Sequence, residues 1–153
     1  MREMRRKDRE IKDRKEIDEI MEKADVLHLA MAKDNIPYVV PLSFGYDGKN
    51  IYFHCAKEGL KLDFIKKNPN VCFECVSYVK YEPVMTSCDA GTKFISAIGR
   101  GRAEIVSDVE EKKKGLDAIV YHYTKSKIEY PPNALLGTTI VKITVNELKG
   151  KKR

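Results

Sequence analysis

Near the start of the chain, apolar residues recur at the spacing of an amphipathic helix. Asp13 followed by Glu16 is typical of a helix start, with Asp13 as the capping residue. Four apolar residues then stand at positions i, i+3, i+4 and i+7, which form one stripe of a helix: Ile17, Ile20, Met21 and Ala24. The pattern predicts a helix over residues 13–23, preceded by a charged, exposed arm over residues 1–12.

After this helix the apolar positions change to strand-like runs separated by turn residues. Three runs come first, over residues 26–32, 38–46 and 51–56, with an Asp34-Asn35 turn and the strong hairpin signal Asp47-Gly48 between them. A short helix that carries Leu60 and Phe64, together with Leu62 and Ile65, follows and must end near Asn68-Pro69. The first half of the chain is therefore expected to form three antiparallel strands and two helices.

The second half contains three further strand-like segments, over residues 71–82, 93–106 and 138–145. Gly99 and Gly101 lie inside one of them, where glycine usually marks a bulge, a bend or a close approach. Ser107 with Glu110 predicts the start of a third helix. The whole pattern predicts a mainly β (α+β) fold: about six antiparallel strands in a small barrel of Greek-key type with flanking helices.

Length and composition fit one domain over residues 1–153, because 42% of its residues are apolar. We find neither an apolar stretch near the roughly 20 residues that cross a bilayer nor a signal peptide. The sequence therefore predicts a cytoplasmic protein without a membrane partner. Its four cysteines are expected to remain thiols in that compartment.

A net charge of +6 could indicate a nucleic-acid partner, but much of this charge is confined to the end of the chain. Four of the positive charges lie in a basic tail over residues 147–153, at Lys149, Lys151, Lys152 and Arg153. The remaining body carries only about +2. We therefore expect no nucleic-acid partner, although a barrel that binds single strands through this tail and exposed aromatic residues is one alternative.

Candidate chemistry gathers between Tyr38 and Lys67. Pro41 lies within a predicted strand, where it cannot donate a ladder hydrogen bond, so the strand should be open or edge-like. A planar heterocycle such as an isoalloxazine could bind the backbone of Leu42 and Ser43 and the Ser43 hydroxyl. An ordinary edge strand is the alternative interpretation.

Two further features of this stretch fit a phosphorylated ligand. The predicted helix start Gly59-Leu60-Lys61 offers free amides, a positive dipole end and a cation, although a lysine in the first turn of a helix is usually just solvated. His54 lies on the strand before this helix, where it could contact the ligand or donate a proton, or serve as a structural histidine. The Asp47-Gly48 hairpin is expected to place Pro41 to Ser43 on the neighbouring strand, so that the three pieces converge.

Cys72 and Cys75 form a CxxC pair, but residues three apart on a strand point to opposite faces. This spacing makes a poor chelate, and no clustered histidines add ligands. We therefore predict no metal site.

Several segments together resemble the FMN-dependent nitroimidazole-resistance proteins of the pyridoxamine-5′-phosphate-oxidase-like superfamily. They are MRR with REIKD, PYVVPLSFGYDG, IYFHCAKEGLKLD, NPNVCFE and ISAIGRGRAEIV, of which the stretch from Pro37 to Glu74 is the specific part. The resemblance implies a split β-barrel homodimer with two FMN molecules at the subunit interface. It also implies a set of FMN-binding residues: Val40, Pro41, Leu42 and Ser43 at the ring, His54, Cys55, Leu60 and Lys61 near the ribityl phosphate or the adjacent pocket, and Ser96 from the partner subunit.

The resemblance makes His54 the catalytic candidate, facing the substrate. The chain lacks the Trp-Arg signature of true pyridoxamine-phosphate oxidases and contains no tryptophan, which argues against that activity. We therefore expect an FMN-dependent oxidoreductase that reduces a small acceptor such as a nitroimidazole or another nitro compound. A flavin-binding or flavin-storing protein without turnover is the alternative.

Overall fold

The computed structural model describes residues 3–82, 91–130 and 137–153 of the chain. Over these residues the chain forms a short 3-10 turn, eight strands and three α-helices. The helical segments are η1 (Lys7–Arg9), α1 (Arg14–Lys23), α2 (Leu60–Lys67) and α3 (Val109–Thr124). The strands are β1 (Glu10–Ile11), β2 (Leu27–Lys33), β3 (Ile36–Leu42), β4 (Gly45–Tyr46), β5 (Asn50–Cys55), β6 (Asn70–Glu82), β7 (Gly91–Ile105) and β8 (Thr139–Lys152).

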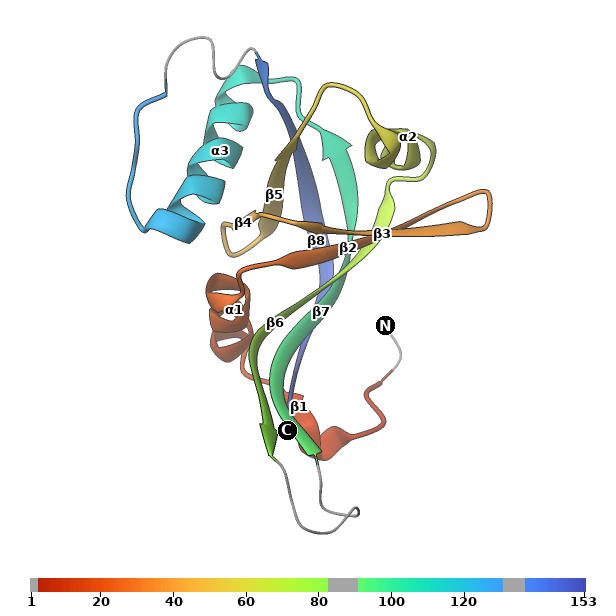
Figure 1. Ribbon diagram of the computed structural model, residues 1–153, viewed down its shortest axis with the longest axis vertical. Helices are drawn as coiled ribbons and strands as arrows, with labels where there is room; N and C mark the ends of the chain where they lie inside the picture. Colours follow the sequence, from red (N-terminus) through yellow and green to blue (C-terminus); the bar gives the residue numbers. More distant parts are fainter. Residues whose placement is uncertain (1–2, 83–90, 131–136) are drawn as a thin grey trace.

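All strand pairs are antiparallel and form one sheet in the order β3-β2-β6-β7-β8-β5-β4, with β1 paired to β8. In Figure 1, α2 and α3 lie on opposite sides of the long strands, and α1 lies beside β6. The mainly antiparallel β fold with three helices is as the pattern predicts. Within the described residues, β3 and β4 end the path and do not pair with each other.

Both long helices begin at an aspartate. Asp13 caps α1 as expected, and its side chain accepts the N–H of Lys15 at 3.0 Å. The cap of α3 is Asp108, which accepts the N–H of Glu111 at 2.8 Å, so the prediction of Ser107 as the cap was wrong. Asp108 with Glu111 has the same three-residue spacing, and a carboxylate is the stronger acceptor.

The strand predicted over residues 38–46 is in fact two strands. It breaks after Leu42, and Phe44 turns into the core, where its side chain is fully buried. Gly45 then packs against α3 so closely that a Cβ at this position would overlap the backbone of Ala118. This break and the short β1 raise the strand number from the expected six to eight.

The last strand is longer than its apolar alternation indicated. β8 continues to Lys152, and Lys151 is paired with Ser96 of β7 and Glu10 of β1. The residues predicted as a basic tail are therefore mostly strand, and the arm before α1 is only partly exposed, because Ile11 is buried. Pairing partners on both sides override the polar composition of this segment.

Two glycines in β7 mark a bulge and a close approach, as predicted. The register of β7 against β8 shifts between Arg100 and Gly101. A Cβ at Gly99 would overlap the ring of Phe73, and one at Gly101 would overlap the carbonyl oxygen of Thr144. The sheet can therefore bend here without losing its packing.

The core lies between the sheet and the helices and is built from large apolar side chains. Phe44, Phe53 and Phe73 are among its fully buried members. On α2, Leu62 and Ile65 are buried as expected, whereas Leu60 is 55% exposed and does not belong to the core. Among the residues that the structure describes, we find no helix with the length and apolar character needed to span a membrane.

Candidate functional site

The strand β3 is an edge of the sheet, which confirms the interpretation of Pro41. Within the described chain it pairs only with β2, where Pro41 lies opposite His28. Pro41 and Ser43 are exposed and Val40 is half-buried, whereas the Leu42 side chain is buried. Leu42 can therefore offer only its backbone to a ligand, and the unpaired edge of β3 supplies free donors and acceptors.

The strand β5 carries His54 and Cys55 at its end. The residues from Asn50 to Phe53 are buried, His54 is exposed and Cys55 is half-buried. Contrary to the prediction, β5 does not lie beside Pro41 to Ser43 in the sheet, because its ladder partners are β8 and β4. The turn at Phe44 brings β4 alongside β5 and leaves β3 paired to β2.

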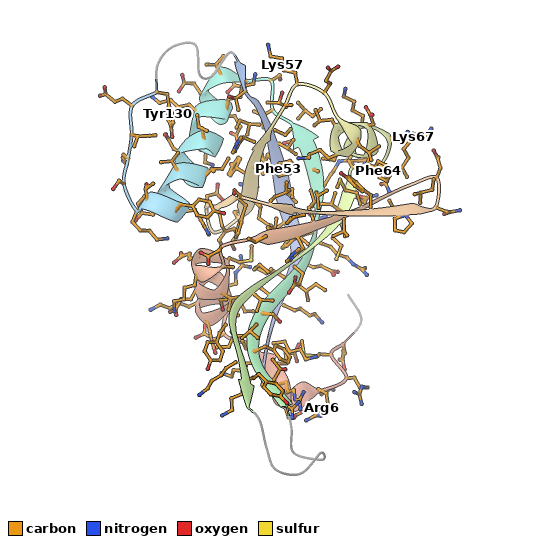
Figure 2. The ribbon with its side chains drawn as sticks, in the orientation of Figure 1. Arg6, Phe53, Lys57, Phe64, Lys67 and Tyr130 are labelled. Carbon is orange, nitrogen blue, oxygen red and sulfur yellow. The ribbon has the colours of Figure 1, made fainter. Side chains whose placement is uncertain are left out.

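The helix α2 nevertheless joins these two strands through the core. The rings of Tyr38 on β3 and Phe64 on α2 lie 5.1 Å apart. Leu42, Leu62 and Cys55 belong to or pack on the same apolar cluster. Figure 2 shows Phe53 and Phe64 on β5 and α2, and Lys57 in the link between these elements. The start of β3 therefore packs against α2, and the end of β3, the end of β5 and α2 bury side chains in the same large core.

The start of α2 provides positive charge and uncapped amides. Its cap residue Gly59 has φ 141° and no side chain caps the helix. Burial raises the pKa of Cys55, and the charge of Lys61 offsets part of this rise. Lys57 is exposed between β5 and α2 and is a further cation that the sequence analysis did not single out. Such a helix start favours an anion.

Ser96 stands apart from these residues. It lies on β7 between Val76 of β6 and Lys151 of β8, toward the end of the sheet that carries β1. The other eight predicted site residues lie at the end of β3, the end of β5 and the start of α2, whereas Ser96 lies on a strand that none of these segments pairs with directly, apart from the core that they share.

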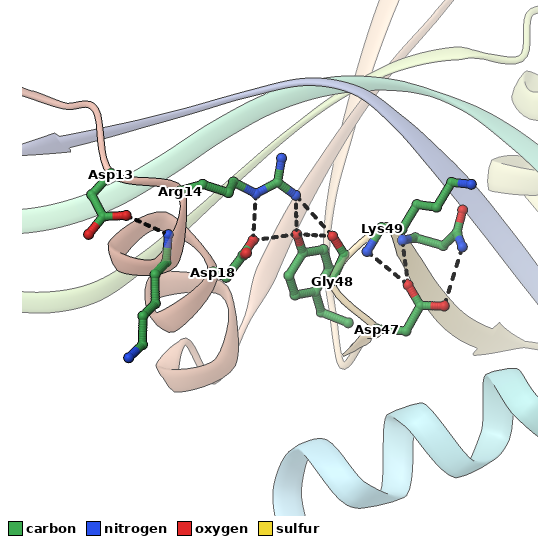
Figure 3. Close-up of polar contacts among 9 residues, drawn as sticks. Asp13, Arg14, Asp18, Asp47, Gly48 and Lys49 are labelled. Carbon is green, nitrogen blue, oxygen red and sulfur yellow. Dashed lines mark hydrogen bonds and ion pairs between the residues drawn. The ribbon is translucent and has the colours of Figure 1, made fainter.

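The hairpin between β4 and β5 is fixed by two sets of polar contacts, which Figure 3 shows. Arg14 binds the carboxylate of Asp18 at 2.8 Å and donates to the carbonyl of Gly48 at 2.9 Å. Asp47 accepts the backbone N–H of Asn50 at 2.6 Å, and such hydrogen bonds outweigh burial and hold its pKa at about 2. The turn predicted at Asp47-Gly48 is therefore confirmed and is tied to α1.

The C-terminal end of α3 reaches the residue that follows Ser43. The Tyr123 hydroxyl accepts the N–H of Phe44 at 3.0 Å and donates to the carbonyl of Asp25 at 2.8 Å. His122 is buried, its ring lies 4.4 Å from that of Phe44, and its Nε2 lies 2.8 Å from the Ala24 carbonyl. The sequence gives no sign of these contacts, because contacts between such distant segments leave no periodic signal.

The cysteines form no site in the described part of the chain. Cys55, Cys72 and Cys75 are free thiols, while Cys88 lies outside the described residues. Cys75 is buried with its Sγ 3.5 Å from the Met21 sulfur. Among the described side chains we find no cluster of three potential metal ligands.

A cavity of about 530 Å³ opens on a different part of the sheet, on strands β2, β6, β7 and β8. Ala30, Cys72, Arg100 and Glu147 are among its lining residues. None of the nine predicted site residues lines it, so the candidate site is a surface elsewhere on the chain.

Comparisons with known proteins show where else this fold occurs. A candidate 5-nitroimidazole antibiotic resistance protein from Bacteroides thetaiotaomicron is 33% identical and superimposes with a TM-score of 0.83 over 94% of this chain and 86% of its own. This confirms the resemblance to nitroimidazole-resistance proteins. The shared fold extends to an FAD-binding protein from Mesorhizobium loti, which is 23% identical, with a TM-score of 0.67 over 95% of this chain and 97% of its own.

Two further comparisons bear on family membership. An uncharacterized protein of Rhizobium meliloti is 26% identical over 68 residues, which are 44% of this chain and 44% of that protein. The sequence model of the pyridoxamine 5'-phosphate oxidase family matches residues 13–152. Since this match spans nearly all of the sequence, from the start of α1 to the end of β8, the chain belongs to the pyridoxamine 5'-phosphate oxidase family.

Proposed function

We propose that this protein binds FMN and uses it to reduce a small acceptor such as a nitroimidazole. One observation carries the proposal: an unpaired strand edge at Pro41 shares a core with an uncapped, cationic helix start. The first offers alternating backbone donors and acceptors to a planar ring, and the second offers amides and positive charge to a phosphate. The flavin named for the Mesorhizobium loti relative supports this choice of ligand class.

The residues present fit the two ends of such a ligand. Ser43 is exposed and Val40 half-buried on β3, where they would line the ring with Pro41 and the Leu42 backbone. At the other end, Lys61 would neutralise the phosphate, together with the amides of Leu60 and its neighbours. Cys55 would lie between the two ends, because it packs on the shared core near Lys61.

The reaction divides between the cofactor and the chain. Reduced FMN would supply two electrons to a nitro group, which takes up two protons and loses water to become a nitroso group. His54 lies exposed at the end of β5, where its ring would deliver one of those protons. The chain otherwise binds and orients the reactants. The vitamin oxidase activity is not proposed, because the Trp-Arg signature is missing.

We also propose that two copies of the chain complete the site. Large apolar side chains are exposed on β3, where Ile36 is 63% and Val39 is 61% accessible. A partner subunit that covers this edge would remove them from water and could bring its own Ser96 to the flavin. Light scattering should therefore give a dimer mass, and the Val39→Lys variant should shift it toward the monomer and bind FMN more weakly.

The binding experiment is a titration of flavin-free protein with FMN, followed by quenching of flavin fluorescence. Lys61→Ala should weaken binding about tenfold, because it removes a charge-assisted contact to phosphate. Lys66→Ala is the matched control, since Lys66 is exposed in the last turn of the same helix. Equal affinity of the Lys61→Ala and wild-type proteins would contradict the phosphate assignment.

The turnover experiment separates the enzyme from a flavin store. The FMN-loaded protein is reduced without oxygen and mixed with a 5-nitroimidazole, and flavin reoxidation is followed by absorbance. We expect fast reoxidation that is slowed in His54→Gln. A wild-type protein that holds FMN but does not reoxidise would support the alternative of flavin binding without turnover.

A further inference from the structure

The last turn of α3 closes the open end of the hairpin that carries the proposed ring site. β2 and β3 form this hairpin around the Asp34-Asn35 turn, and their ladder ends where Leu27 lies opposite Leu42. Just beyond that pair, the two chains separate. Asp25 precedes β2 and Phe44 follows β3, and one hydroxyl, that of Tyr123, binds the backbone of both.

The contacts of Tyr123 replace ladder bonds that this part of the backbone lacks. Ser43 and Phe44 lie between the end of β3 and the start of β4, outside both ladders. The Phe44 N–H instead donates to the Tyr123 oxygen at 3.0 Å. Because this hydroxyl also donates to Asp25, it joins the two hairpin ends through a single atom.

His122 adds a second connection at the same place. Its Nε2 lies 2.8 Å from the carbonyl of Ala24, the residue before Asp25, and its ring packs on the Phe44 ring at 4.4 Å. Gly45 meanwhile lies directly against the α3 backbone at Ala118. The backbone on the far side of Ser43 is thus held against a helix by packing as well as by hydrogen bonds.

We infer that Tyr123, supported by His122, is a positioning residue for the flavin ring: it fixes Ser43 and the end of β3 in the conformation that binds the ring. This inference rests on the proposed function. Tyr123 contacts neither the ring nor the acceptor in this scheme. It acts by holding the binding backbone in place before the ligand arrives, which lowers the ordering cost of binding.

Tyr123→Phe is the direct test, because it removes one oxygen and keeps the ring. We expect FMN to bind about fivefold more weakly, which corresponds to the loss of one ordinary hydrogen bond. The visible absorption bands of bound FMN should shift, because the backbone that contacts the ring moves. In the flavin-free variant, the Phe44 amide should exchange with solvent faster, as measured by NMR.

Two control variants separate positioning from a general loss of stability. Tyr121→Phe removes a hydroxyl from the same helix, where Tyr121 is exposed and has no hydrogen bond among the described residues. It should match wild type in all three measurements. Ile119→Val loosens the packing of α3 in a core cluster that does not include Phe44, and should lower the melting temperature while leaving the flavin bands in place.

The outcomes distinguish this inference from the function on which it rests. If wild type binds FMN and Tyr123→Phe binds it with unchanged affinity and spectrum, the positioning role is wrong while the flavin site stands. The role is also wrong if Ile119→Val produces the same band shift. If wild type binds no flavin, the proposed function fails. In that case, a Phe44 amide that exchanges at the wild-type rate in Tyr123→Phe would also show that Tyr123 does not hold the end of β3 in place.

Discussion

The two helices that flank β5 meet the sheet in opposite ways. At the start of α2, Gly59 supplies no side-chain cap, and Lys57 and Lys61 have no ion pair within the described chain. Along α3, in contrast, polar groups are matched. Asp108 caps the helix, and the buried Tyr52 donates to Glu111 at 2.9 Å.

This difference indicates that the α2 start serves ligand binding, whereas the α3 side stabilises the fold. Unmatched amides and cations cost little in water but gain much from an anionic ligand. Matched, buried groups stabilise the fold and gain nothing from a ligand. Apart from Tyr123 and His122, which hold the proposed ring site, substitutions on the α3 side should therefore lower the free energy of unfolding, whereas those at the α2 start should lower affinity alone.

The largest effect is expected for Phe44→Ala. Phe44 is fully buried against His122, and such truncations cost about 4 kcal/mol because they leave a cavity. Leu60→Ala is the matched change at the α2 start, where the side chain is 55% exposed, and it should cost less than about 0.5 kcal/mol. Urea unfolding of both variants measures the contrast, and equal losses would contradict the comparison.

A smaller loss is expected for Tyr52→Phe. The ring stays buried, but its hydroxyl no longer donates to the Glu111 carboxylate, at a cost of about 1.5 kcal/mol. Affinity for FMN should stay at the wild-type value, since Tyr52 faces α3. A variant that unfolds like wild type would show that this hydrogen bond stabilises nothing, and weaker FMN binding would show that Tyr52, like Tyr123, is coupled to the proposed ring site.

How much of this could be predicted from the sequence depends on the range of the interactions. The α1 stripe, the Asp47-Gly48 turn and the edge position of Pro41 follow from local spacing and from proline's missing N–H, and all three were found. The break at Phe44 was missed because it depends on α3, which comes more than sixty residues later. The pattern of apolar positions gives no information on such contacts.

The candidate site divides in the same way. Leu60, Lys61 and His54 could be located because a helix start and a strand end have local signals. The expectation that β3 and β5 are neighbours in the sheet was wrong. A turn signal shows that two strands form a hairpin, but it does not show that the first strand breaks, so that β4 rather than β3 pairs with β5. Tyr123 and His122 were missed because their backbone partners, at Phe44, Asp25 and Ala24, carry no residue signature.

The α3 side should also respond to acid. Burial lowers the pKa of His122 below its ordinary value of 6.5, and Lys125 lowers it further, against the Ala24 carbonyl and the charges of Asp25 and Glu22. The unfolded chain therefore binds more protons than the folded chain once the pH falls below 6.5. The free energy of unfolding should be constant for this group above about pH 7 and should fall as the pH drops through 6.5.

Urea unfolding between pH 8 and pH 5 measures this dependence, and His122→Gln should flatten it. The flattening should be confined to the range below 6.5, because the neutral amide has no proton to take up. If the free energy of unfolding of the variant still falls with pH as steeply as in wild type, the acid sensitivity belongs to other groups. His122 would then not be one of the buried groups that stabilise the α3 side.

The smallest expected effect is on the reactivity of the Cys55 thiol, on the α2 side. Burial raises the pKa of Cys55 and the Lys61 charge lowers it, so Lys61→Ala should leave less thiolate at a given pH. Alkylation of Cys55 by iodoacetamide at pH 8, followed by peptide mass mapping, should slow about two- to threefold in the flavin-free variant, because the thiolate is the reactive form. Lys66→Ala, five residues further along the helix, should react like wild type. FMN should protect Cys55 in wild type, since the thiol and Lys61 would then lie under the same ligand. If FMN binds and Cys55 still reacts at the flavin-free rate, the thiol lies outside the site. The end that binds the phosphate must then be assigned to Lys57 and its surroundings instead.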